Sequence, residues 1–115
     1  MKVVFNIVIV LCCLTSFAQE QKVIYEKTEN DLVKATYYFD DNNSVIQKEG
    51  FFNNKGKLHG TWTNYNAEGN KTIIATYNNG IKEGVWTFIK NDKISLVTYK
   101  NNKITNVEEK QLVIQ

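Results

Sequence analysis

Residues 60–84 read GTWTNYNAEGNKTIIATYNNGIKEG, and the chain then starts the same pattern again with Gly84-Val85-Trp86-Thr87. The Gly-x-Trp-Thr motif thus recurs after 24 residues, from Gly60 to Gly84. An internal period of this length is typical of proteins built from a repeated structural unit. Segments rich in branched and aromatic residues alternate with Asn-Gly turn signals. The stretch therefore predicts a unit of two short strands and two turns.

The same alternation of strands and turns continues on both sides of this stretch. An aromatic residue followed by two asparagines, with one lysine between them in the last case, marks a strand end at Phe52, Tyr77 and Tyr99, with spacings of 25 and 22 residues. Short connections join antiparallel neighbours, whereas parallel strands need long crossovers. We therefore expect an all-β, single-domain antiparallel β-meander of about six or seven strands over residues 32–115. The lead-in segment 19–31 is consistent with either an edge strand or a loose segment.

The first eighteen residues have the pattern of a secretory signal peptide. A positively charged start precedes a short apolar run, and the small residues Ser16 and Ala18 stand at positions −3 and −1 of a cleavage site. We expect a helical signal peptide over residues 1–18, cleaved after Ala18, and a secreted or periplasmic protein. A retained N-terminal anchor is the alternative. Both cysteines, Cys12 and Cys13, lie in the apolar run, and neither follows the small residue that lipidation requires.

Composition argues against some classes of partner. The chain has 115 residues, a net charge of +2 and 43% hydrophobic residues, as in a globular domain. All 14 basic residues are lysines, and they are interspersed with acidic residues. Arginine makes most bidentate contacts to guanine and phosphate. We therefore expect no nucleic-acid partner.

No group of residues predicts catalysis or metal binding. His59 is the only histidine and is placed in a turn before Gly60, so it cannot assemble a zinc site or a catalytic triad by itself. The segment Asp40–Ser44 resembles the start of a calcium loop. It lacks the glycine at the sixth position and the glutamate at the twelfth, where Val45 and Phe51 stand. We expect no metal, no cofactor and no enzymatic activity.

The motifs Gly60-x-Trp62-x-x-Tyr65-x-x-x-Gly69 and Tyr77-x-x-Gly80-x-x-x-Gly84-x-Trp86 resemble the variant MORN repeat. The layout is similar to that of small secreted proteins of the YwqK-like "antitoxin" group of Bacteroidetes-type bacteria. The resemblance covers roughly residues 32–104 and weakens in the first and last units. It implies a meander of hairpins in one continuous sheet. For function it implies contacts with proteins and, in some settings, with membrane lipids.

Two sets of residues stand out for their recurrence. The aromatic set forms either the apolar core of the sheet or an exposed binding face, and both readings stay open: Phe52, Trp62, Tyr65, Tyr77, Trp86, Phe88 and Tyr99. The glycine set is placed at strand boundaries, where turns demand a positive φ: Gly60, Gly69, Gly80 and Gly84.

These observations favour a non-catalytic interaction module outside the cytoplasm. We expect it to bind a protein or the cell-envelope surface, where a lipid or a glycan is a further candidate ligand. One alternative is a structural protein that self-associates by adding edge strands. Another is an antitoxin-like protein that neutralises a partner. The charged residues Glu108, Glu109 and Lys110 interrupt the last predicted strand, as in strands that protect a sheet edge.

Overall fold

The computed structural model describes residues 21–39 and 44–111. The predicted signal peptide, its cleavage after Ala18, most of the predicted Asp40–Ser44 turn and the end of the last predicted strand lie outside these residues. Within the described ranges there is no helix long and apolar enough to cross a membrane.

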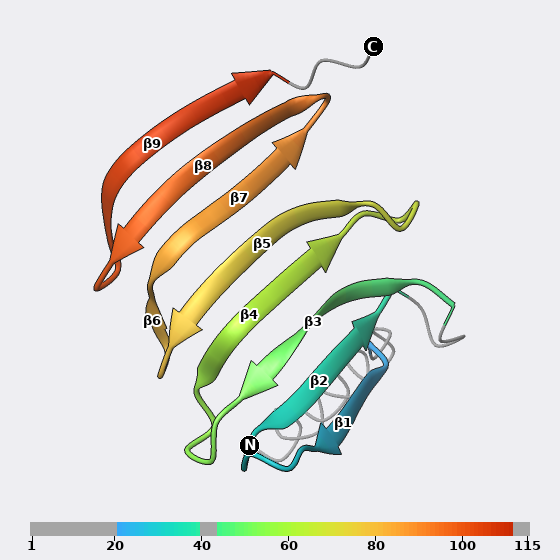
Figure 1. Ribbon diagram of the computed structural model, residues 1–115. Helices are drawn as coiled ribbons and strands as arrows, with labels where there is room; N and C mark the ends of the chain where they lie inside the picture. The colour runs from blue at the N-terminus through green and yellow to red at the C-terminus, as the bar shows by residue number, and fades with distance from the viewer. Residues whose placement is uncertain (1–20, 40–43, 112–115) are drawn as a thin grey trace, which may run out of the picture.

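The described residues form one antiparallel sheet in which the strands follow one another in chain order (Figure 1). The strands are β1 (Val23–Lys27), β2 (Val33–Tyr38), β3 (Ile46–Phe52), β4 (Leu58–Tyr65), β5 (Lys71–Asn78), β6 (Ile81–Lys82), β7 (Gly84–Lys90), β8 (Lys93–Lys100) and β9 (Lys103–Gln111). Each strand pairs with the next along the chain, with one exception. The short strand β6 pairs only with β5, and β7 also pairs with β5. The all-β antiparallel meander predicted from the sequence is confirmed.

The sheet has nine strands in its described part, more than the six or seven expected. The lead-in segment forms β1, which pairs along its whole length with β2 from Val23↔Tyr37 to Lys27↔Val33. It is therefore an edge strand and not a loose segment. The second addition is β6, which is only two residues long and is separated from β7 by the single residue Glu83.

Asparagine builds the turns in two ways. In the longer turns, the Asn53 and Asn66 side-chain oxygens each accept two backbone N–H bonds, at 2.9 and 3.0 Å. The shorter turns place two successive residues at positive φ, which asparagine, aspartate and glycine tolerate best: Asn79-Gly80, Asn91-Asp92 and Asn101-Asn102. Five residues join Tyr65 to Lys71, and two join Lys90 to Lys93. The units therefore differ in length mainly at their turns.

One face of the sheet carries both tryptophans, and we call it the aromatic face. A cross-strand row on this face places the small residues Ala35, Gly50 and Ala75 on the strands around Trp62. A Cβ atom added to Gly50 would lie 2.0 Å from the Trp62 indole, so the ring lies flat on the neighbouring strand. This arrangement leaves Trp62 5% and Trp86 7% exposed in a single-layer sheet. The core therefore consists of rings lying along the sheet.

The Gly-x-Trp motif has a structural explanation in hydrogen bonding. Near Gly60 the pairing of β3 and β4 shifts register, and the Trp62 indole N–H donates to the Phe51 carbonyl at 2.9 Å. In the next unit the Trp86 indole N–H donates to the Thr76 carbonyl at 3.0 Å. A buried indole needs a partner for its N–H, and a ladder irregularity provides a carbonyl within reach. Glycine and tryptophan thus work together in each unit.

Candidate binding face

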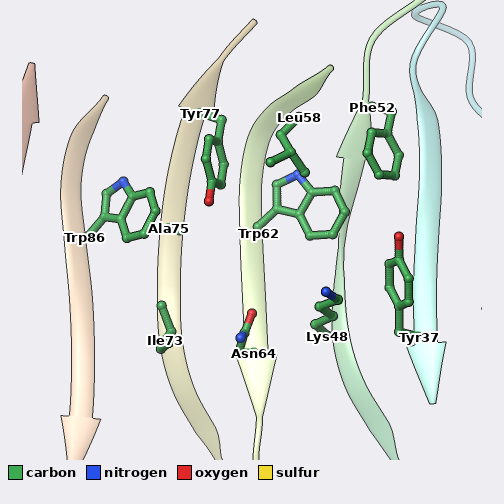
Figure 2. A pocket seen from close by; sticks show the side chains of 10 residues that line it. All are labelled: Tyr37, Lys48, Phe52, Leu58, Trp62, Asn64, Ile73, Ala75, Tyr77 and Trp86. Carbon is green, nitrogen blue, oxygen red and sulfur yellow. The ribbon is translucent and has the colours of Figure 1, made fainter. Parts of the chain in front are cut away.

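The aromatic face contains a groove that crosses the strands. Its volume is about 280 Å³, and Figure 2 shows the side chains that line it projecting from one side of the sheet. They come from β2, β3, β4, β5 and β7, and they are Tyr37, Lys48, Phe52, Leu58, Trp62, Asn64, Ile73, Ala75, Tyr77 and Trp86. Both indoles, which belong to the buried core, are among these lining side chains. The groove is therefore a hollow over the core rather than a cavity within it.

Six of the seven aromatic residues singled out in the sequence gather on this face. The ring centroids of Phe52 and Trp62 are 5.1 Å apart, and those of Tyr77 and Trp86 are 5.2 Å apart. The ring centroids of Phe88 and Tyr99 lie 6.2 and 4.9 Å from that of Trp86. The tryptophans are buried, whereas the four surrounding rings are half-buried. Core and candidate binding surface are therefore made of the same side chains.

Tyr65 does not belong to this set. Its hydroxyl donates to Glu49 at 2.6 Å, and Glu49 pairs with Thr63 on the opposite face. Successive side chains of a strand point to opposite faces, so Trp62 and Tyr65, an odd number of positions apart, separate. Its inclusion with the aromatic face was wrong.

The recurring glycines all adopt positive φ, between 75° and 88°: Gly60, Gly69, Gly80 and Gly84. Gly69 and Gly80 lie in turns and Gly84 begins β7, but Gly60 lies inside β4 and not at its boundary. His59 also lies in β4 rather than in the preceding turn. Its Nδ1 accepts a hydrogen bond from the Asn79 backbone N–H at 3.1 Å. His59 thus links the ends of two units.

Two lysines on the aromatic face are part of the site and were not singled out in the sequence. The Lys48 ammonium lies 4.6 Å from the Tyr37 ring centroid, and that of Lys82 lies 5.1 Å from both Trp86 and Tyr99. Such contacts place a cation over the negative face of a ring. Cross-strand pairing creates them, because Tyr37 stands opposite Lys48. The signal in the sequence for Lys48 is its even spacing from Phe52, four residues further on, which places both side chains on one face of the strand.

The hydroxyls of Tyr37 and Tyr77 on this face stay protonated at neutral pH. Burial raises the pKa of Tyr77, and neighbouring Tyr99 adds to the effect. Burial also raises the pKa of Tyr37, with a further contribution from Tyr25. Both hydroxyls therefore act as neutral hydrogen-bonding groups beside the lysines.

On the opposite face, Tyr65 makes stability depend on pH. The hydrogen bond to Glu49, followed by burial and the negative charge of Glu49, raises the pKa of Tyr65 from 10.0 to about 12. Because folding raises this pKa, the protonated Tyr65 hydroxyl stabilises the folded protein. Its contribution to the free energy of unfolding is present in full below pH 10 and is lost as the pH rises through about 12. We expect the melting temperature of Tyr65→Phe to lie below that of the native protein at pH 9, and the difference to shrink towards pH 12. A difference that stays constant over this range would contradict the assignment.

Within the described residues, no three His, Cys, Asp or Glu side chains gather where they could hold a metal ion. The chain matches no family model, no curated protein and no solved structure. The resemblance to variant MORN repeats therefore rests on the motifs of this chain and stays a prediction.

Proposed function

We propose that this protein is a non-catalytic β-repeat interaction module, acting outside the cytoplasm, that binds a component of the cell envelope through its aromatic face. The observation that carries the proposal is the groove of about 280 Å³ over the buried indoles. Half-buried aromatic side chains with a few polar groups are typical of binding surfaces. The location outside the cytoplasm rests on the signal pattern of residues 1–18.

Self-association by edge-strand addition is less well supported than binding through the aromatic face, because of the features of the edge strand β9. All nine residues of β9 are exposed, so its outer edge is accessible. However, β9 carries Glu108, Glu109 and Lys110, and its pairing with β8 shifts register between Thr98 and Tyr99. Charges and bulges are the means by which proteins prevent edge pairing. An antitoxin-like role would use the aromatic face with a protein as its occupant.

Co-sedimentation with the envelope fraction of the producing organism tests the proposal. Asn64→Glu places a larger, charged side chain in the groove, and Thr87→Glu makes the same charge change on the opposite face. We expect Asn64→Glu to weaken envelope binding by at least about tenfold, because charge at the centre of an interface is costly. Thr87→Glu is expected to bind as the native protein does. Equal binding by both variants, at equal melting temperatures, would refute the proposal.

A further inference from the structure

The charges of the sheet are divided unevenly between its two faces. Strand register places Lys27, Lys48, Lys82, Lys90 and Lys93 on the aromatic face. Of the acidic residues in the described strands, Glu26, Glu49 and Glu108 lie on the opposite face. Only Glu109, on the edge strand β9, shares the aromatic face. A net charge of +2 for the whole chain therefore conceals a cationic face.

The lysines of this face have no acidic partner within the described part of the chain. The one ion pair there joins Lys34 to Glu49 at 4.0 Å, on the opposite face. Lys48 and Lys82 lie over aromatic rings instead. Because two copies of this face would bring lysines against lysines, like-charge repulsion disfavours a face-to-face dimer. The unpaired positive charge of this face therefore favours an anionic ligand.

A second hollow extends the groove along the same face. It has a volume of about 570 Å³ and is lined by Phe88, Lys90, Asn91, Lys93 and Ser95. Phe88 contacts Trp86, which lines the first groove, so one aromatic pair joins the two hollows. Each hollow thus combines aromatic surface, a side-chain amide and lysine. A ligand that repeats one chemical unit along its length would meet similar groups twice.

Several of the residues that line the groove have polar side chains. The groove crosses inner strands, each of which has a paired strand on both sides, so it offers an extended peptide no free sheet edge to join. It provides instead the Asn64 amide, the Tyr37 and Tyr77 hydroxyls and the Lys48 ammonium. Hydroxyl-rich sugars use such donors and acceptors, and their C–H faces pack on aromatic rings.

We propose, as a deepening of the proposed function, that the aromatic face binds an anionic polysaccharide whose sugars carry carboxylate groups. The sugar rings lie against the half-buried aromatic side chains of the groove. The carboxylates lie near Lys48 in the first hollow and near Lys90 and Lys93 in the second. Asn64 and the tyrosine hydroxyls bond to the sugar hydroxyls.

Titration calorimetry with the purified native protein and an oligogalacturonate at low ionic strength tests this inference. The double variant Lys48→Gln/Lys93→Gln removes one lysine from each hollow. Lys100→Gln/Lys110→Gln makes the same charge change on the opposite face. We expect the first double variant to weaken binding by about tenfold and the second to change it by no more than about twofold. Methyl esterification of the oligomer is expected to weaken binding as the first double variant does.

Three results would overturn the inference. Equal loss of affinity in the two double variants would mean attraction to overall charge alone. Binding of poly-glutamate as tight as that of the oligogalacturonate would mean an acidic peptide as the occupant. Absence of oligogalacturonate binding, together with envelope binding that Asn64→Glu abolishes, would reject the polysaccharide and leave the proposed function standing. Melting temperatures of both double variants close to the native value would exclude misfolding as the cause.

Discussion

Replacing Trp86 by alanine is expected to unfold the protein or nearly so at ambient temperature. Trp86 is 7% exposed, packs against Tyr77 and Tyr99, and donates its indole N–H to the Thr76 carbonyl. Truncating a buried tryptophan to alanine costs about 3–5 kcal/mol. The entire free energy of unfolding of a small domain is about 5–15 kcal/mol. A single-layer sheet has no second layer of side chains to fill the space that the indole leaves.

Thermal unfolding followed by circular dichroism measures this effect. We expect Trp86→Ala to lower the melting temperature by more than about 15 °C. Val85→Ala is the matched control, since Val85 is the adjacent residue, is 51% exposed and points to the opposite face. Trp86→Phe keeps a ring but loses the bond to Thr76, so its melting temperature should lie between the two. A melting temperature unchanged in Trp86→Ala would remove this residue from the core.

The second large effect is expected from adding one methyl group, at Gly50. A Cβ atom there would lie 2.0–2.3 Å from three atoms of the Trp62 indole, well inside contact distance. The indole cannot move freely, because its N–H donates to Phe51 and its ring packs edge-on against Phe52. Overpacking of a filled core costs about 1–3 kcal/mol and occasionally more. We expect Gly50→Ala to reach the upper end of this range.

A double-mutant cycle separates this clash from the backbone effect of replacing glycine. In a Trp62→Leu background the smaller side chain leaves room for the added methyl group. Gly50→Ala should then change the free energy of unfolding much less, giving a coupling of about 1–3 kcal/mol. Urea denaturation of the four proteins measures the coupling. Additive effects would mean that Trp62 does not lie on Gly50.

Much of the fold could be predicted from the sequence because its turns are explicit. Asparagine and glycine mark almost every reversal of the chain, and short reversals require antiparallel neighbours. The first strand could not be predicted in this way. Only Val23, Ile24 and Tyr25 are apolar or aromatic within the polar segment 19–31, which is too short a run to decide between strand and loop, and the strand is held in place by its pairing with β2. The two-residue β6 is too short for any pattern.

The candidate site was less predictable, because it depends on which strands face each other. Period-two alternation within β7 places Trp86 and Phe88 together, and alternation within β4 should have separated Tyr65 from Trp62. The contact of Lys82 with Trp86 and Tyr99 depends on cross-strand register. A lone glycine inside a strand indicates a close approach, but not which residue approaches. Only the folded sheet identifies Trp62 as the neighbour of Gly50.

The order of the strands has a consequence for how this protein would respond to mechanical force. Apart from β5, which also pairs with the short β6, each strand of the path from β1 to β9 pairs only with its immediate neighbours, and the first and last strands lie at opposite edges of the sheet (Figure 1). Tension applied between those edges acts across the strands and not along them. The interstrand hydrogen bonds of a hairpin then break one after another in a peeling geometry, rather than all bearing the load at once in shear. A molecule held between two anchored partners would therefore lengthen hairpin by hairpin at low force, starting from its ends.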